Sequence, residues 1–270
     1  MYSVIIPTFN RALILEKNLE KLMEIRDKIE LIIIDDGSKD ITEKIVEKYL
    51  RIMRITYHKN KKNMGSPYSW NLGIQLAKND SLLLLNDDTF IINPQKFLNI
   101  LKIDLKSADI IGFKIIDNES KKSIFDAFLS FFAGNIYFYQ GNKQKYVDFT
   151  SGCMLITRKV SNLVKFNLIY KGNAYREESD FQVRARKFGF KILYDPNLSI
   201  YHLKAKKGGQ RERNDKKWYI INHLIFLRRN FKYTKIYKVI FFMVIALLSS
   251  KSIRQLKQKI SAIRYAFWIK

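Results

Sequence analysis

Short apolar runs alternate with longer amphipathic segments through the first 116 residues of the chain. Runs rich in Ile, Leu and Val are typical of buried strands, and we expect strands at residues 2–7, 31–36, 51–58, 81–86 and 108–116. Apolar residues recur at helical spacing between these runs, which predicts helices at residues 11–27, 38–50 and 66–78 and one that begins at Pro94. Strands and helices in alternation predict an α/β fold with a mostly parallel sheet flanked by helices.

The rest of the chain is less regular. Residues 117–150 are rich in aromatic side chains and form either a flap that faces a substrate or ordinary core. We expect a strand within 147–160, a helix at 174–189 that ends at Gly189, and two short extended segments, FKILYDP and LSIYH. Two basic helical segments, 214–231 and 252–270, and the apolar run 239–248 follow. The pattern predicts two parts, a domain at residues 1–209 and a basic amphipathic helical tail at 210–270.

Polar residues follow three of the predicted strands: PTFN after the first, DDGS after the second and NDDT after the fourth. The carboxyl ends of parallel strands lie at one edge of a sheet, and ligands bind there. Asp87 and Asp88 repel each other unless a positive charge lies close by. A divalent cation supplies that charge, and oxygen ligands favour Mg²⁺ or Mn²⁺. The NDDT stretch therefore indicates a metal–diphosphate site, with an exposed Asp-rich turn as the alternative.

Two other acidic stretches also have two interpretations. In DDGS, a carboxylate can bind a ribose or a base, whereas Ser38 can simply cap the next helix. In EESD, residues 177–180, a carboxylate can act as a catalytic base. Alternatively, these acids lie at a helix start because the helix dipole and ion pairs with Arg176 and Arg184 stabilise them there.

Five stretches together resemble family 2 glycosyltransferases in their order and spacing: SVIIPTFNR, LIIIDDGSKD, NMGSPYSWNLGI, LLLLNDDT and EESDFQVRARKFGFKILYDP. These are inverting enzymes of GT-A fold that use nucleotide sugars. The resemblance covers roughly residues 2–209 and implies a Rossmann-like nucleotide-binding half. It implies contacts with the donor nucleotide for Pro7, Thr8, Asn10, Asp35, Asp36, Asn63, Gly65, Asn71, Asn86 and Asp87.

The resemblance also implies the metal ligands. Asp88 matches the last residue of the family's Asp-x-Asp motif and is the expected ligand of Mg²⁺ or Mn²⁺, with Asp87 and His202 as further candidates. Asn86 stands at the first position of this motif, where it supplies an amide oxygen but no charge. The basic residues that follow His202 are expected to close over the phosphates: Lys204, Lys206, Lys207 and Arg211.

The catalytic base is expected in the EESD stretch, because an inverting transfer needs a carboxylate to take the proton of the acceptor hydroxyl. Glu178 lies where the family carries an Asp that is read as the base, and Glu177 is the second candidate. We expect Asp180 either to orient the base or to pair with Arg184. Trp70 and His223 are expected to be structural.

Composition separates the tail from the rest of the chain. The 270 residues carry a net charge of +24, and Lys204–Lys270 alone contain 18 basic and 2 acidic residues. We expect this tail to lie on an anionic membrane surface, with packing on the domain, oligomerisation or an acidic glycan as alternatives. The N-terminus does not resemble a signal peptide, and the longest apolar run is too short to span a membrane. A single cysteine, Cys153, excludes an internal disulfide.

The sequence thus predicts an inverting glycosyltransferase that moves a sugar from a nucleotide diphosphate to a hydroxyl of a glycan or lipid-linked acceptor. We expect it to be cytoplasmic and peripheral on the inner face of the cell membrane, and to serve cell-surface polysaccharide or glycoprotein glycan assembly. A polyprenyl-phosphate sugar synthase is the alternative enzyme. A nucleic-acid-binding protein is the alternative of another class, although no helix-turn-helix, zinc or RNA-sheet signature accompanies the charge.

Overall fold

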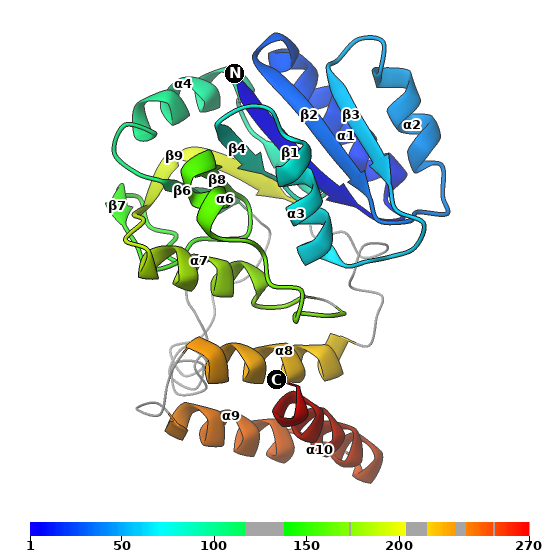
Figure 1. The fold of residues 1–270 in the computed structure, drawn as a ribbon, viewed down its shortest axis with the longest axis vertical. Helices are drawn as coiled ribbons and strands as arrows, with labels where there is room; N and C mark the ends of the chain where they lie inside the picture. The colour runs from blue at the N-terminus through cyan, green and yellow to red at the C-terminus, as the bar shows by residue number, and fades with distance from the viewer. Residues whose placement is uncertain (117–137, 173, 204–214, 231–235, 251, 270) are drawn as a thin grey trace.

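The computed structural model describes residues 1–116, 138–172, 174–203, 215–230, 236–250 and 252–269 (Figure 1). The strands are β1 (Tyr2–Thr8), β2 (Ile29–Asp35), β3 (Ile55–Lys59), β4 (Ser81–Leu84), β5 (Thr89–Ile91), β6 (Ile110–Ile116), β7 (Lys145–Tyr146), β8 (Met154–Thr157) and β9 (Ile192–His202). The helices of the first part are α1 (Ala12–Leu22), the short 3₁₀ helix η1 (Met23–Lys28), α2 (Thr42–Tyr49), α3 (Ser66–Leu76), α4 (Pro94–Asp104), α6 (Arg158–Leu163) and α7 (Glu177–Lys187). Those of the tail are α8 (Asp215–Asn230), α9 (Ile236–Leu248) and α10 (Ile253–Trp268).

One mixed sheet organises the domain, with the strand order β3-β2-β1-β4-β8-β6-β9-β5 and β7 paired to β9. Strands β3, β2, β1 and β4 are parallel, whereas β8 runs antiparallel to both β4 and β6. The chain moves outward from β1 to β3 and then returns to the other side of β1 with β4. This reversal places the ends of β1 and β4 side by side, at a point where open α/β sheets bind ligands.

The alternating direction of side chains along β1 explains why helices cover both faces of the sheet. Val4 and Ile6 belong to the core cluster formed with α1, α2 and α4. Ile5 belongs to the cluster on the other face, which includes Trp70 of α3 and Phe181 of α7. Successive side chains of a strand point to opposite faces, so a run of consecutive apolar residues requires helices on both sides. The predicted α/β fold with flanking helices is confirmed (Figure 1).

Several predicted boundaries are wrong. The third strand begins at Ile55 rather than at residue 51, and the strand within 147–160 is limited to Met154–Thr157 because α6 follows it at once. Strand β5 was not predicted. The two extended segments after α7 form one strand, β9, which passes through Pro196. Proline has no N–H to donate, and the register with β6 shifts between Phe113 and Lys114 as the chain passes it.

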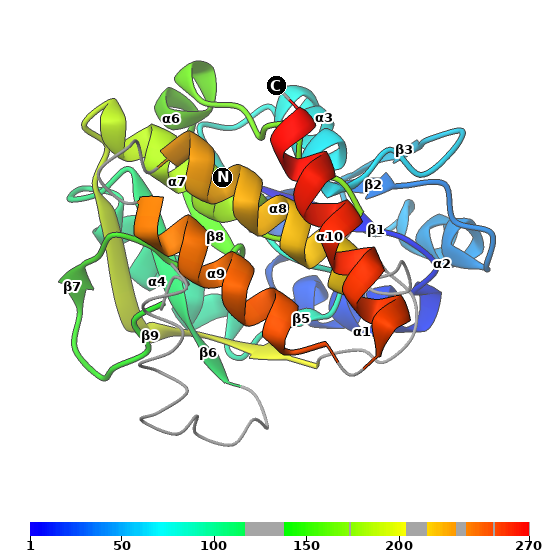
Figure 2. The same ribbon diagram turned by 90° about the horizontal axis from the view of Figure 1, so that it is seen from below.

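The tail packs onto the domain through α8. Helix α8 shares an apolar cluster with Tyr170 and Ala174, which precede α7, and with buried residues of α9 and α10. Figure 1 shows α8 between α7 and the last two helices, and Figure 2 shows α9 and α10 on the side turned toward the viewer. Packing, one of the alternatives considered for the tail, is seen for one face of α9, through Phe242 and Ala246 of the apolar run 239–248. Among the described helices, none has the length and apolar character needed to cross a membrane.

Candidate active site

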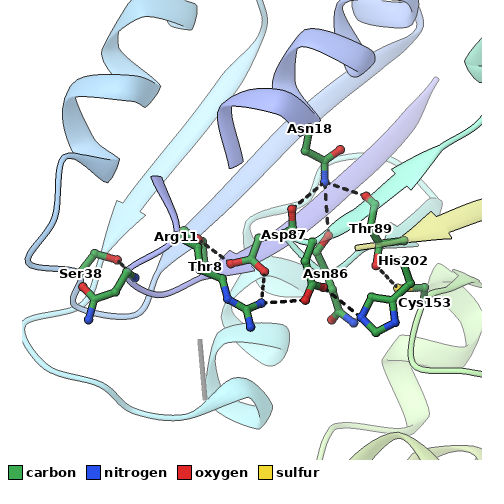
Figure 3. A network of polar contacts seen from close by, with 11 residues as sticks. Thr8, Arg11, Asn18, Ser38, Asn86, Asp87, Thr89, Cys153 and His202 are labelled. Carbon is green, nitrogen blue, oxygen red and sulfur yellow. Dashed lines mark hydrogen bonds and ion pairs between the residues drawn. The ribbon is translucent and has the colours of Figure 1, made fainter. Parts of the chain in front are cut away.

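The ends of β1 and β4 bring one cation against two carboxylates (Figure 3). Arg11, directly before α1, places Nη1 2.8 Å from Oδ1 of Asp87 and 3.0 Å from Oδ2 of Asp88. Thr8, the last residue of β1, donates its hydroxyl to Oδ2 of Asp87 at 2.9 Å. These four side chains form a closed polar cluster at the reversal of the strand order.

Burial makes this cluster electrostatically important. The side chains of Arg11, Asp87 and Asp88 are 7%, 6% and 4% exposed. Burial lowers the pKa of Arg11, but the charges and hydrogen bonds of the two aspartates outweigh it, so this pKa is raised. Burial also raises the pKa of Asp87, and the Arg11 charge opposes that change. Removing one partner of such a buried pair leaves an uncompensated charge, which is strongly destabilising.

Arg11 was not predicted to belong to this cluster. A positive charge was expected beside Asp87 and Asp88, but it was assigned to a metal alone. The signal was present, because Arg11 follows the first strand as closely as the acids follow the fourth. Only the strand order reveals that these two strand ends are neighbours.

His202 reaches the same acids from the end of β9. Its Nε2 lies 3.4 Å from Oδ1 of Asp88, the oxygen that Arg11 does not contact at hydrogen-bond distance. Strand pairing fixes this approach, since Thr89 of β5 lies opposite His202 and Leu203 N–H donates to the Asp88 carbonyl at 2.9 Å. The predicted neighbourhood of His202 and Asp88 is therefore present in the structure.

The donor set fits a divalent metal that uses few protein ligands. Asp88 and His202 offer one carboxylate oxygen and one imidazole nitrogen at one place. In the described part of the chain, no group of three His, Cys, Asp or Glu residues is arranged to hold an ion. A Mg²⁺ or Mn²⁺ ion commonly takes only one or two protein carboxylates and fills the remaining positions with water and substrate phosphates.

An amide on α1 holds the loop after β4 (Figure 3). Asn18 is fully buried and donates Nδ2 to the carbonyl oxygens of Asn86, Asp87 and Thr89 at 3.3, 3.3 and 2.8 Å. The side chain of Asn86 is exposed at the surface of this loop, while both following aspartates are buried. Asn18 was not predicted from the sequence, since an Asn on an apolar helix face gives no indication of which loop it contacts.

The carboxylates that follow β2 are engaged with protein donors. Asp35 accepts from Ser38 N–H at 2.7 Å and from the Tyr57 hydroxyl at 2.8 Å. Asp36 accepts from Asn60 Nδ2 and from the backbone N–H groups of Met64 and Gly65, at 2.9, 2.7 and 2.9 Å. Their direct role in the structure is to fix the turn at β2 and the loop before α3. Contacts with a base or ribose remain predictions.

The other residues predicted to contact the donor nucleotide lie in the loops after β1 and before α3, or within β1. Asn10 has φ 52° and links the loops after β1 and β2, because its N–H donates to Ser38 Oγ and its Oδ1 accepts from Lys39 N–H. Asn63 and Gly65 are partly exposed, and Gly65 precedes α3 with φ 96°, a conformation that favours glycine. Pro7 lies within β1.

Asn71 has a structural role that was not predicted. Its Nδ2 donates to the Phe166 carbonyl and its Oδ1 accepts from Phe166 N–H, both at 2.8 Å. The two ends of the amide are thus committed to a chain segment 95 residues away, so its predicted contact with the donor receives no support from this geometry.

Glu177 is locked at the start of α7. The Ser66 hydroxyl lies 2.6 Å from both of its carboxylate oxygens, and Trp70 Nε1–H donates to Oε1 at 3.3 Å. Burial, followed by the nearby Glu178 charge, raises the pKa of Glu177 well above that of an ordinary glutamate. Trp70 is buried in the core, as expected.

Glu178 is the more accessible acid. It is partly exposed, and among the described residues no other side chain hydrogen-bonds its carboxylate. Burial raises its pKa, while a bond to its own backbone and the charge of Arg176 oppose this change. A Cβ at Gly152 would lie 3.6 Å from the Glu178 Cγ, at ordinary van der Waals distance, so the chain before β8 passes beside this acid.

The segment before β8 connects the two acidic clusters. Cys153 Sγ lies 3.5 Å from Thr89 Oγ1, beside Asp88, and Glu178 lies against the preceding glycine. Burial raises the pKa of Cys153 to about 11, with smaller contributions from the charges of Asp88 and Glu178. Cys153 is therefore a buried neighbour of both clusters and unsuited to be a nucleophile at neutral pH.

Asp180 is buried, unlike the partly exposed Glu178. It accepts from Arg184 Nε and from Asn230 Nδ2 of α8, both at 2.8 Å. The ion pair with Arg184, one of the two roles considered from the sequence, is present. Arg176 donates Nε–H to the buried His223 Nδ1 at 3.1 Å, which gives His223 a structural role.

Some predicted parts of the site lie outside the described residues: the aromatic stretch of 117–137 and the basic residues Lys204, Lys206, Lys207 and Arg211.

Comparison with known families decides the assignment. The sequence pattern described as "Glycosyl transferase family 2" matches residues 3–163 of the chain. The chain belongs to glycosyltransferase family 2. The matched range includes β1, β2 and β4 with the polar loops that follow them, and the predicted resemblance is confirmed.

Several relatives are similar to part of the chain. A chondroitin synthase of Escherichia coli is 34% identical over 139 residues, which cover 47% of this chain and 19% of that protein. An uncharacterized glycosyltransferase of Haemophilus influenzae is 34% identical over 104 residues, which cover 38% of this chain and 34% of that protein. The chain thus spans about a third or less of these relatives. An uncharacterized protein of Methanocaldococcus jannaschii is 28% identical over 74% of this chain and 89% of its own length.

Solved structures share the fold. Residues 1–349 of Staphylococcus aureus TarS in complex with UDP-GlcNAc give a TM-score of 0.67 at 16% identity, over 98% of this chain and 80% of that one. The mannosyltransferase PcManGT of Pyrobaculum calidifontis, in complex with GDP-Man and Mn²⁺, gives 0.62 at 16% identity, over 100% and 75%. The expected GT-A fold of this glycosyltransferase is confirmed at the level of overall architecture.

Proposed function

We propose that the protein is an inverting glycosyltransferase that transfers a sugar from a nucleotide-diphosphate donor to a hydroxyl group. The observation that carries this proposal is the pair of acidic clusters on either side of Cys153. One contains the Arg11 cation, and the other contains Glu178, a carboxylate that has no side-chain hydrogen-bond partner among the described residues. Family membership and the nucleotide-sugar complexes of the structural neighbours support the same reaction.

Glu178 is the proposed general base. Its raised pKa suits a group that accepts a proton during the reaction, because a base acts best when its pKa approaches the working pH. The acceptor hydroxyl gives its proton to Glu178 while its oxygen bonds to the anomeric carbon. The bond from that carbon to the diphosphate breaks, and the nucleoside diphosphate leaves with the electron pair. Attack from the side opposite the leaving group inverts the configuration.

The leaving diphosphate is proposed to bind at the β4 end of the site. Asp88 and His202 are the residues that would hold Mg²⁺ or Mn²⁺ there. When bound, such an ion neutralises the charge that develops on the diphosphate. Arg11 keeps Asp87 and one oxygen of Asp88 compensated, so the carboxylates are held in place whether or not an ion is present.

The acceptor proposed here is a hydroxyl of a glycan or of a lipid-linked glycan at the inner face of the cell membrane. This would place the enzyme in the assembly of cell-surface polysaccharide or glycoprotein glycans. Among the relatives are a chondroitin synthase and a Campylobacter jejuni glucosyltransferase named for an undecaprenol-linked glycan. Transfer to a polyprenyl phosphate is the alternative, and it would make a general base unnecessary, so Glu178→Gln would leave its rate nearly unchanged.

Calorimetry of the purified protein against a panel of nucleoside diphosphates, with and without Mn²⁺, tests the proposal. We expect one of them to bind, more tightly when Mn²⁺ is present. That result also identifies the base and the sugar donors for product analysis, in which the anomeric configuration reports inversion. A folded protein that binds none of the panel under either condition contradicts the proposed donor site.

A further inference from the structure

Helix α9 is apolar apart from Lys238, yet only one of its faces is covered. Phe242 and Ala246 pack into the cluster shared with α8 and α10. The other face carries four apolar side chains at helical spacing that are 46–79% exposed: Tyr237, Ile240, Val244 and Leu248. Apolar helix faces are normally buried. In the described part of the chain, this face of α9 is left exposed.

Helix α10 presents a second row of exposed apolar residues. Ala262, Ile263 and Ala266 are buried against α8 and α9, while four side chains at helical spacing are 36–75% exposed: Ile253, Leu256, Ile260 and Phe267. At the end of the helix, Trp268 is 78% exposed. We name the exposed apolar residues of α9 and α10 the outer face of the tail. Both helices lie on the side of α8 that is away from the sheet (Figures 1 and 2).

The charge around this outer face has a single sign. Residues 216–270 contain 13 Lys and Arg residues and no Asp or Glu. Arg254, Lys257 and Arg264 are exposed on α10 itself. An occupant of this face must therefore offer an apolar interior together with negative charge at its surface.

We propose that the outer face of the tail binds an anionic membrane, with α9 and α10 lying in the plane of the headgroups. A bilayer meets both requirements, because the acyl region receives the apolar side chains while anionic headgroups pair with the basic ones. A helix of 13 residues is too short to span the bilayer but suffices to lie on it. The inference rests on the proposed function only in that a lipid-linked acceptor gives this attachment a purpose.

Vesicle flotation with the full chain tests the proposal directly. The probes are vesicles of phosphatidylcholine alone and of phosphatidylcholine with phosphatidylglycerol. We expect at least a tenfold stronger partition into the anionic vesicles and a weakening of that partition at high salt. Trp268 gives a second signal, since its emission should shift to shorter wavelength on binding and be quenched by brominated lipid, and Trp268→Phe should remove the shift.

A matched pair of variants assigns the effect to the outer face. Ile240→Glu with Val244→Glu places two charges on exposed α9 positions, where they do not disturb the core, and should lower the partition at least tenfold. The control carries the same change at Leu13 and Ile103, which are 64% and 67% exposed on α1 and α4, and should bind vesicles as the wild type does.

Three outcomes would overturn the proposal: a folded wild type that floats with neither vesicle, an α9 variant that floats as the wild type does, or a dimer in light scattering that the α9 variant converts to a monomer. The last outcome would make the outer face a self-association surface. Nucleotide binding measured on the same samples separates the two proposals, because the α9 variant keeps the donor site. A wild type that does not float but still binds nucleotide contradicts the membrane inference alone.

Discussion

Two pairs of adjacent carboxylates lie at the candidate active site, and the surrounding residues compensate their charges differently. Asp87 and Asp88 share the buried cation Arg11. No ion pair in the described structure ends on Glu177 or Glu178, although the charge of Arg176 acts on Glu178. The donors that Glu177 receives are a hydroxyl and an indole N–H. Opposite charge favours the ionised form of a carboxylate, whereas burial without it favours the neutral form. The first pair is thus suited to binding cations, and the second to exchanging a proton.

The strongest test of this comparison is Glu178→Gln. Loss of a general base should lower kcat about 10²–10⁴-fold while nucleotide binding stays unchanged. Steady-state kinetics with the donor identified by calorimetry, together with calorimetry of the variant, measures the two effects separately. A variant with wild-type turnover would remove Glu178 from the reaction.

Asp88→Ala tests the other pair and should have a somewhat smaller effect. The variant loses the carboxylate that faces His202, so kcat should fall about 10²–10³-fold, as when one stabilising group at a developing charge is removed. Unlike Glu178→Gln, this variant should also lose the Mn²⁺ dependence of nucleotide binding. If Mn²⁺ still tightens binding to the wild-type extent, Asp88 is not the metal ligand.

Arg11→Gln tests the same comparison, because it should increase the affinity of the Asp87–Asp88 pair for a metal ion. Removing the cation makes the net charge of the cluster more negative, from −1 to −2, because Asp87 and Asp88 then face each other without compensation. We expect Mn²⁺ without nucleotide to bind at least about tenfold more tightly. Unit charges 4 Å apart interact by about 4 kcal/mol at an effective dielectric constant of 20, which sets an upper limit of about 10³-fold. Electron paramagnetic resonance of free Mn²⁺ measures this, with the exposed Arg54→Gln as control and circular dichroism to verify folding. Unchanged or weaker Mn²⁺ binding would mean that Arg11 does not offset these acids.

The smallest effects are expected from pH and from Glu177→Gln. The pKa of Glu178 is raised, and the base acts when ionised, so kcat should fall as the pH drops, with a midpoint above the ordinary glutamate value of 4.5.

Burial already favours the neutral form of Glu177, so Glu177→Gln should change kcat by less than about tenfold. A pH–rate profile of both proteins checks this; a flat acidic limb in the wild type would argue against a carboxylate base.

The fold of the nucleotide-binding half was predictable because its elements follow from local pattern. Runs such as VII and LIII identify strands, and Pro94 marks a helix start that the structure confirms. Strand β5 was missed because its three residues gain their structure from pairing with β9, more than 100 residues away. The continuity of β9 through Pro196 was missed for a related reason, since the shift in register with β6 is a property of the pair of strands.

The sequence provided candidate residues for the site but not their contacts. The NDDT pattern led to Asp87 and Asp88, and the family resemblance led to Glu178 and His202; the structure brings these candidates to the same edge. It did not reveal that Arg11 supplies a positive charge, nor that Asn71 is occupied by the Phe166 backbone. Both facts depend on which segments are neighbours in space, and the single sequence contains the residues but not that adjacency.

The position of Cys153 has a practical consequence for anyone who wishes to label this protein. It is the only cysteine in the chain, it is 4% exposed, and its pKa is about 11. Only ~10⁻⁴ of it is thiolate at neutral pH, so a maleimide dye should react with it very slowly. A cysteine introduced on the surface can therefore be labelled in the native background, for fluorescence or spin probes, without first removing Cys153. Any slow reaction of the native thiol would then report how often the segment before β8, which lies between the two acidic clusters, opens.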